Sequence, residues 1–134
     1  MLQFTMSSIG ISVNSMYINR GRYRLLSPEA REWRENATIE LETQINPYVE
    51  PQIKALKNAQ LAVSVCFYSD TWFLKSGQIR VKDVESYSKI TCDTLFTVLK
   101  TIEPTLDDKL IFSLTLKKMI GDKDKTLVTI EPIY

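Results

Sequence analysis

The 134-residue chain contains no histidine, and it has only four glycines, five prolines and two cysteines. Without an imidazole, the chain has neither a Ser-His-Asp nor a Cys-His catalytic site, and it has no histidine-ligated zinc. The scarcity of glycine and proline, together with 44% apolar residues, excludes collagen-like and low-complexity disordered chains. Acid–base or metal chemistry therefore has to come from carboxylates and lysines.

The two cysteines, Cys66 and Cys92, stand alone in apolar stretches without CxxC spacing. They are typical of small core residues in a reducing compartment. The segment 1–14 has neither a basic stretch nor an apolar run, so we expect no signal peptide and no membrane span. The length predicts a single domain over residues 1–134, and the whole pattern predicts a cytoplasmic protein.

Basic and acidic residues nearly cancel, at 17 against 16, but they are unevenly distributed. The segment 1–26 carries Arg20, Arg22 and Arg24 and no acid, whereas 83–108 carries six acids and two lysines. A net charge of +1 is low for a protein that holds nucleic acid by bulk electrostatics alone. Such an alternation suits cation-dependent chemistry on a polyanion, and solvated helices also produce it.

In the first half of the chain we expect a strand over residues 2–7, a long loop over 7–19 that leads into the sequence RGRYR, and then a helix. The helix begins at Ser27-Pro28, because a serine caps free amides and proline at the first helical position loses no hydrogen bond. It runs to Asn46-Pro47. Its apolar stripe, which predicts a face buried in the core or in a dimer, comprises Ala30, Trp33, Ala37, Leu41 and Ile45.

In the second half we expect an irregular segment over 47–58, a central strand over 61–68, and a loop or hairpin over 69–82 in which aromatic and basic residues alternate. A second helix is expected from Asp83 to Lys100, followed by strands over 110–116 and 126–130 that the turn 121–124 joins into a hairpin. The predicted class is α+β, a mixed β-sheet with two main helices in the order β-α-β-α-β-β.

Two carboxylate pairs lie at element ends, Asp83 with Glu85 and Asp107 with Asp108. Two or three carboxylates from separate segments suffice for a magnesium ion, which retains water for a substrate phosphate. Lys89, one helical turn beyond Glu85, is placed to stabilise charge on such a phosphate. A solvated helix face with i,i+4 ion pairs is the alternative interpretation of this stripe.

At this point the sequence becomes recognisable. The stretch KDVESYSKITCDTLF at 82–96, followed by LDD at 106–108, resembles the RusA family of Holliday junction resolvases. Asp83 matches the first aspartate of the family's motif, Lys89 its lysine and Asp93 its helical aspartate, and the pair 107–108 matches the later aspartates. The segment SVNSMYINRGRYRLLSPEAREWR at 12–34 is similar to the family's opening motif, so the resemblance spans nearly the whole chain.

The resemblance implies a homodimeric, magnesium-dependent endonuclease, with manganese as a substitute, that resolves four-way DNA junctions by paired nicks during recombination and repair. It implies a prokaryotic or phage origin. The implied metal ligands are Asp83, Glu85 and Asp108, supported by Asp107, and the implied catalytic lysine is Lys89, which would also contact DNA. Further DNA contacts are expected from the basic residues Arg20, Arg22, Arg24, Lys75, Arg80 and Lys82.

Two positions depart from the family's pattern. The second motif aspartate is Glu85, whose extra methylene displaces the carboxylate by about 1.5 Å, and the following asparagine is Ser86. An alternative function is therefore a catalytically impaired RusA-like protein that binds branched DNA without cleaving it. A third hypothesis is an unrelated, non-catalytic interaction domain whose acids are only solvated.

Overall fold

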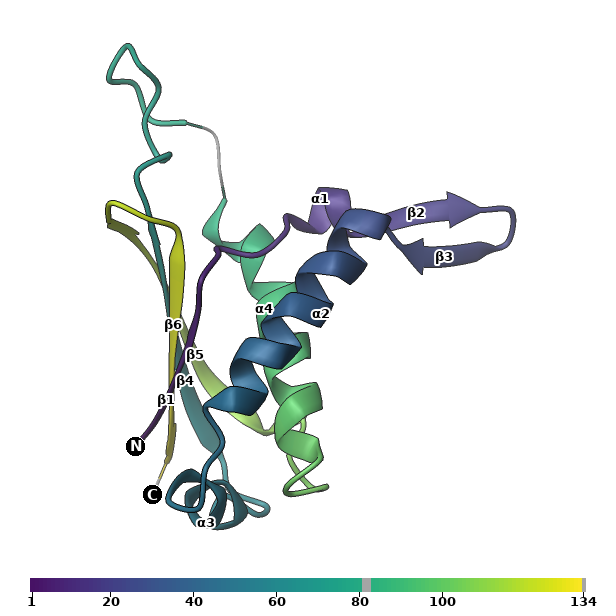
Figure 1. The fold of residues 1–134 in the computed structure, drawn as a ribbon, viewed down its shortest axis with the longest axis vertical. Helices are drawn as coiled ribbons and strands as arrows, with labels where there is room; N and C mark the ends of the chain where they lie inside the picture. The colour runs from purple at the N-terminus through teal and green to yellow at the C-terminus, as the bar shows by residue number, and fades with distance from the viewer. Residues whose placement is uncertain (81–82, 134) are drawn as a thin grey trace.

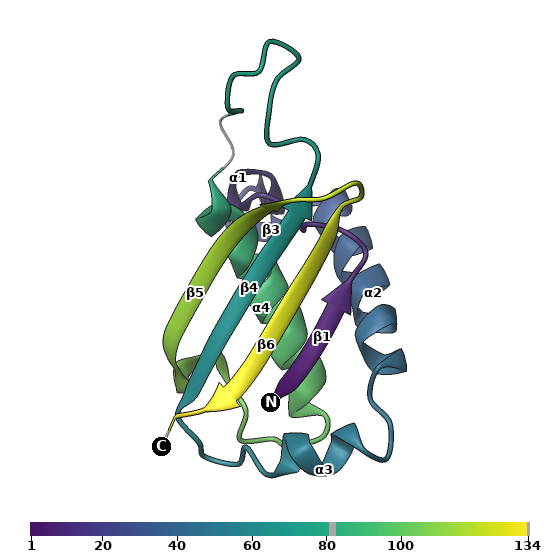
Figure 2. The same ribbon diagram turned by 90° about the vertical axis from the view of Figure 1, so that its left-hand side faces the viewer.

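The computed structural model describes residues 1–80 and 83–133. A four-stranded sheet has the order β1-β6-β4-β5, in which β4 and β5 are parallel and the other neighbours are antiparallel. Its strands are β1 (Leu2–Met6), β4 (Leu61–Ser69), β5 (Ile111–Ile120) and β6 (Lys125–Pro132). The α+β class with a mixed sheet is confirmed, as is the interior position of β4. Figure 2 shows this sheet with β5 and β1 at its two edges.

Two main helices, α2 (Pro28–Thr43) and α4 (Val84–Lys100), cover one face of the sheet (Figures 1 and 2). The Ser27 hydroxyl accepts a hydrogen bond from the Ala30 amide at 3.1 Å, which is the predicted cap. In α2 the apolar stripe is buried at Ala30, Trp33, Ala37 and Leu41, so the core interpretation of that stripe is confirmed. The helix ends at Thr43, before the Asn46-Pro47 boundary that the sequence predicts.

Alternation along β4 explains how the sheet meets the helices. Every second residue from Leu61 to Ser69 is buried and the residues between them are half-buried. The buried set faces α4, whose Leu95 and Leu99 are fully buried. Burying such a side chain contributes about 1.5–3 kcal/mol, so this contact is a main source of the fold's stability.

The loop predicted over residues 7–19 is wrong in its second half. Residues Val13–Met16 form a short helix, α1, and Tyr17–Arg20 form strand β2, which pairs with β3 (Tyr23–Leu26) in a separate two-stranded sheet. Gly21 has φ +59, a conformation that only glycine adopts readily, and it closes the turn between these strands. We call β2, β3 and their turn the ribbon; it projects from the body of the protein (Figure 1).

The segment 47–58, expected to be irregular, contains α3 (Val49–Lys54). Its Ile53 is fully buried in the hydrophobic core and anchors this one-and-a-half-turn helix. Packing of one apolar residue can hold so short a helix in place, although six residues are too few to form one alone.

The predicted hairpin of the last two strands is also wrong. β5 and β6 lie on opposite sides of β4, so the turn at 121–124 passes over the end of β4. The Gly121 amide donates to the Ser69 carbonyl at 3.1 Å, and the Ser69 hydroxyl donates to Asp124 Oδ1 at 2.6 Å. Between β4 and β1, β6 forms backbone hydrogen bonds along both of its edges, whereas as a hairpin partner outside β5 it would form them along one edge only.

β5 is an edge strand, and much of it is exposed. Phe112 is 65% exposed and Ile120 is 76% exposed, and Leu114 and Met119 are also exposed. Both cysteines are free thiols, half-buried for Cys66 and buried for Cys92. Within residues 1–80 and 83–133, no helix combines the length and the apolar character that a membrane crossing requires.

Candidate functional site

The first turn of α4 presents two predicted ligands to solvent. Asp83 occupies the N-cap position and is exposed, but its side chain makes no capping hydrogen bond. The Ser86 hydroxyl instead donates to the Asp83 carbonyl at 2.7 Å. Glu85 is also exposed, one residue into the helix. Both carboxylates lie at the N-terminal end of α4, where the free backbone amides and the positive end of the helix dipole attract negative charge.

The later carboxylates meet the middle and end of the same helix. Asp93, Asp107 and Asp108, which we call the acidic cluster, line one cleft of ≈ 150 Å³ together with Lys100. Lys100 Nζ lies 2.7 Å from Asp107 Oδ2, and the Lys109 amide donates to Asp107 Oδ1 at 3.1 Å. These contacts join the end of α4 to the 3-10 helix η1 (Asp108–Leu110) that precedes β5.

Lys89 lies beside this cluster. Its Nζ is 3.4 Å from Asp93 Oδ2, and both side chains are nearly half exposed. This is the i,i+4 ion pair that the solvated-face interpretation predicts, and exposed pairs of this kind contribute about 0.2–1 kcal/mol. Lys89 and Asp93 also line a second cleft, of ≈ 370 Å³, which extends from Asp108 to Phe112 on β5.

The two neighbouring aspartates of the cluster titrate in opposite directions. A hydrogen bond with Asp107, partial burial and the charges of Asp107 and Asp93 raise the pKa of Asp108 above its ordinary value. The hydrogen bond from Lys100, followed by the Lys109 amide, holds the pKa of Asp107 well below the ordinary range. The pair therefore retains a proton on Asp108 at a pH where an isolated aspartate is already ionised.

Cys92 lines the second cleft beside Asp93 and Asp108. Burial, followed by the nearby charges of Asp93 and Asp108, raises its pKa to about 11. The thiol stays protonated at neutral pH, so Cys92 lines the second cleft as an apolar group. Sequence reasoning left Cys92 in the core and did not include Lys100 in the site. The charged stripe Glu85, Lys89, Asp93 and Lys100 along the helix was the signal for Lys100.

The predicted metal ligands are not gathered into one place. Asp83 and Asp93 are ten residues apart in sequence, which in a helix corresponds to about 15 Å, and Asp108 interacts with Asp93. Among the described residues, no three Asp, Glu, Cys or His side chains lie close enough to hold a metal ion. Carboxylate oxygens suit magnesium in their chemistry, but their placement in this chain does not fit one site. Assignment of Asp83, Glu85, Asp107 and Asp108 as ligands stays a prediction.

The basic residues expected to bind DNA occupy two projections. Arg20, Arg22 and Arg24 are exposed on the ribbon, and the Arg24 guanidinium lies 4.1 Å from the centre of the Tyr17 ring. Lys75 and Arg80 are exposed on the loop after β4, which an isolated Phe73–Ile79 bridge closes. Lys82 lies outside the described residues.

The aromatic residues of that loop divide between core and surface. Trp72 is 4% exposed and its indole N–H donates to the Met119 carbonyl at 2.8 Å, so it anchors the loop to β5. Phe73 is 44% exposed and remains accessible to a ligand. The mixture of aromatics and bases therefore includes one packed residue and one accessible residue.

In Figure 1 the start of α4 lies between the two projections. The loop after β4 leads into it from one side, and α1, which packs against α4, leads into the ribbon on the other. Asp83 and Glu85 are thus flanked by basic segments at one end of the sheet. No protein-family model matches the chain, and no curated protein matches it either.

Proposed function

We propose that this protein is a magnesium-dependent endonuclease that cleaves four-way DNA junctions as a homodimer. The observation that carries the proposal is the position of Asp83 and Glu85 between two basic projections, the ribbon and the loop after β4. Arginines and lysines bind phosphates on both sides, and the acids between them would face the phosphodiester that is cut. The sequence pattern from Asp83 to Asp108, similar to that of RusA resolvases, supports the same reaction.

Within this proposal Lys89 is the cation beside the acidic cluster that reaches the phosphate. Its side chain is 48% exposed, so it can leave Asp93 for a phosphate at little cost. Because the predicted metal ligands do not lie close together, no reaction step is assigned to magnesium. Dependence of cleavage on added magnesium, with manganese as a substitute, is the measurement that decides the cofactor.

A second candidate function is binding of branched DNA without cleavage. The specific observation in its favour is that no three described carboxylates form a metal site. The family's asparagine is Ser86 in this chain, and the Ser86 hydroxyl donates to the Asp83 carbonyl within its own helical turn. This position therefore offers no side-chain amide to a ligand. Both features leave the DNA-binding projections intact, so binding would survive the loss of catalysis.

The homodimer is supported by the edge strand β5. Its outer backbone groups pair with no described strand, and Phe112 and Ile120 expose apolar surface beside them. Unpaired edges of this kind pair with other chains unless they are protected. A two-fold axis would place two sites on a junction, as paired nicks require. Sedimentation equilibrium gives the mass of the species, and a monomer at the concentration that cleaves would contradict this part of the proposal.

The decisive experiment incubates the purified protein with a synthetic four-way junction and with a linear duplex, each in magnesium or in EDTA. We expect symmetric nicks in the junction only, only with magnesium, and none with Asp83→Asn. The matched control is Asp122→Asn, which removes an exposed carboxylate from the turn at 121–124 and should cleave as the wild type does.

Each other outcome rejects a stated hypothesis. Tight binding of the junction in EDTA with no magnesium-dependent product refutes the nuclease and supports the non-cleaving binder. Equal affinity for the junction and for linear duplex refutes both functions. Equal cleavage by Asp83→Asn and the wild type would remove Asp83 from the site.

A further inference from the structure

The ribbon divides its side chains between two faces. Pairing of Tyr17 with Leu26 and of Arg20 with Tyr23 puts Tyr17, Arg24 and Leu26 on one face, because side chains alternate along a strand. Tyr17 and Leu26 pack against the core and hold the base of the ribbon. The opposite face carries Arg20 and Tyr23, with Tyr23 72% exposed near the tip. The base is therefore fixed, and the outer face is available to a partner.

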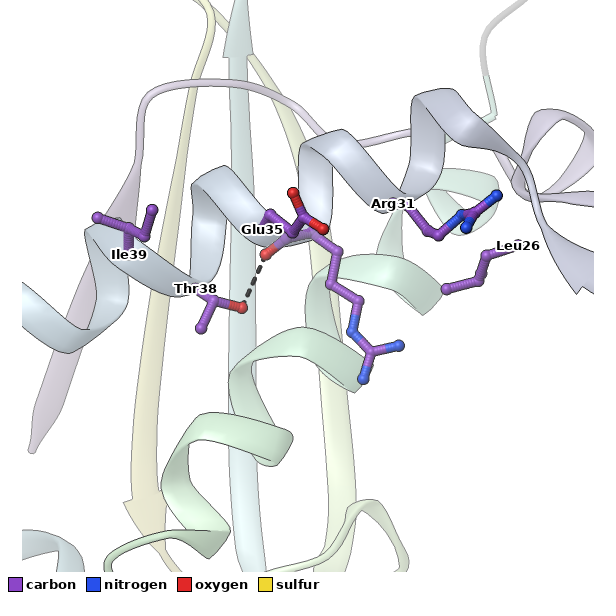
Figure 3. Close-up of a pocket in the computed structure, with 6 residues that line it drawn as sticks. Leu26, Arg31, Glu35, Thr38 and Ile39 are labelled. Atoms are coloured by element: carbon purple, nitrogen blue, oxygen red, sulfur yellow. Dashed lines mark hydrogen bonds between the residues drawn. The ribbon is translucent and has the colours of Figure 1, made fainter.

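The groove at the foot of the ribbon continues this surface onto α2. It has a volume of ≈ 550 Å³ and is lined by Leu26, Arg31, Arg34, Glu35, Thr38 and Ile39. Figure 3 shows Leu26 and Arg31 at one end of the groove and Ile39 at the other. Arg31 and Arg34 thus share one side of α2 next to the last residue of β3.

The charges of this surface are almost all positive. Residues 1–28 contain no Asp or Glu, and on α2 only Glu35 lines the groove beside the two arginines. At 100° per residue, Glu29 and Glu32 point about 100–160° away from Arg31 around the helix. No arginine of the ribbon or of the groove makes an ion pair with any residue that the structure describes. Five guanidinium groups are therefore available to an anionic partner.

We propose that the ribbon enters the major groove of a DNA duplex arm and that Arg31 and Arg34 bind the phosphates along the edge of that groove. A two-stranded β-ribbon fits the major groove, which is about 12 Å wide. Tyr23 lies against base edges, the ribbon arginines contact the flanking phosphates, and the α2 arginines extend the contact to the next phosphates along the strand. The placement rests on the proposed function for its substrate and adds Tyr23, Arg31 and Arg34 to the residues that bind it.

The test measures the affinity of fluorescently labelled junction and duplex in EDTA by anisotropy, over a series of KCl concentrations. The double variant Arg31→Ala/Arg34→Ala should weaken binding and reduce the slope of log K against log[KCl] by about 2, because each phosphate contact releases about 0.9 counterion. Tyr23→Ala should weaken binding about tenfold and leave the slope unchanged, because tyrosine is uncharged.

Two further variants test the location of the effect. Glu35→Ala removes the one acid of the groove and should tighten binding. Lys57→Ala removes an exposed cation after α3, at the end of the protein far from the ribbon, and should bind as the wild type does (Figure 1). Circular dichroism verifies that each variant is folded, as expected for surface positions.

The results separate this inference from the nuclease proposal. Unchanged affinity and salt slope in the double variant and in Tyr23→Ala, with intact junction cleavage, would overturn the ribbon contact and leave the nuclease standing. If the variants bind more weakly but the wild-type protein never cleaves the junction, the ribbon contact is supported and the nuclease proposal is rejected. Tighter binding of a poly-glutamate peptide than of duplex would identify an acidic protein segment as the partner and overturn the DNA assignment.

Discussion

The hydroxyl of Ser69 holds the turn between β5 and β6 over the end of β4, and its removal should be measurable. Ser69 is fully buried. Its Oγ donates to Asp124 Oδ1 at 2.6 Å, lies 2.7 Å from Thr71 Oγ1 and accepts from the Thr71 amide at 3.1 Å. Ser69→Ala removes these three hydrogen bonds without adding any volume.

The expected cost follows from the kind of hydrogen bond that is lost. A bond to a charged acceptor contributes about 1.5–3 kcal/mol, and Asp124 is exposed, so water replaces part of its loss. We expect Ser69→Ala to lower the free energy of unfolding by about 2 kcal/mol, which for a domain of this size lowers Tm by about 7 °C. Chemical denaturation followed by tryptophan fluorescence measures the free energy of unfolding, and thermal unfolding followed by circular dichroism measures Tm.

A double-mutant cycle with Asp124→Ala isolates the bond itself. The two substitutions should cost less together than the sum of their separate costs, with a coupling of about 1 kcal/mol. Ser64→Ala is the matched control, because Ser64 lies on the open face of β4 and its side chain makes no hydrogen bond to a described residue. A cost for Ser69→Ala as small as that of Ser64→Ala, or additive costs in the cycle, would refute the role of this bond.

Two further predictions concern the acidic cluster, and a third concerns the two cysteines. Asp108→Asn should raise Tm at pH 7, because the raised pKa of Asp108 means that its charged form destabilises the fold. The gain in Tm should shrink as the pH falls through that pKa, since the wild-type side chain then becomes neutral too. An equal gain at all pH values would contradict this prediction. Lys100→Met should move the NMR titration midpoint of the Asp107 carboxyl upward, because the Lys100 hydrogen bond is the main cause of its lowered pKa. The stability from this contact is present at neutral pH and is lost as the pH falls. An unmoved midpoint would refute the assignment. Cys92, with a pKa of about 11 and 8% exposure, should resist thiol reagents at pH 8 while the half-buried Cys66 is modified. Mass spectrometry of the digested protein measures the labelling of each cysteine. Labelling of Cys92 at the rate of Cys66 would argue against its burial.

Local signals predict the main elements of this fold well. Ser27-Pro28 starts α2 as expected, and the apolar spacing from Ala30 to Leu41 marks the face that is buried. The alternation from Leu61 onward identifies β4. These features depend on residues within one or two turns of each other, so the sequence carries them directly.

Strand pairing could not be predicted in the same way. The alternation in β5 and β6 indicates strands, and the short turn between them suggests a hairpin, but β6 pairs with β4 and β1 instead. The ribbon was missed because it contains three arginines and only its base, at Tyr17 and Leu26, packs against the core. Partners that are far apart in sequence leave no local pattern.

The site shows the same division. The helical stripe from Lys89 to Lys100 correctly puts Asp93 beside Lys89, since i and i+4 are neighbours on a helix. Asp107 and Asp108 lie beside the second half of α4, near Asp93 and Lys100, and not beside Asp83. This placement depends on the path of the chain between the end of α4 and η1, which no local pattern predicts. The 17-residue helix α4 separates the two pairs of motif acids. Asp83 and Glu85 lie at its start, and Asp107 and Asp108 follow its end.

The position of β6 between β1 and β4 has a consequence for biosynthesis. The first strand pairs only with the last one, Leu2 with Ile130 and Met6 with Thr126, so it has no partner in the sheet until residues 125–132 have left the ribosome. Contacts between such distant segments slow folding and expose unpaired strands in the meantime. β4 and β5 can pair earlier, which makes the β4–α4–β5 unit the expected first structure, with β6 inserted last to join the two ends of the chain.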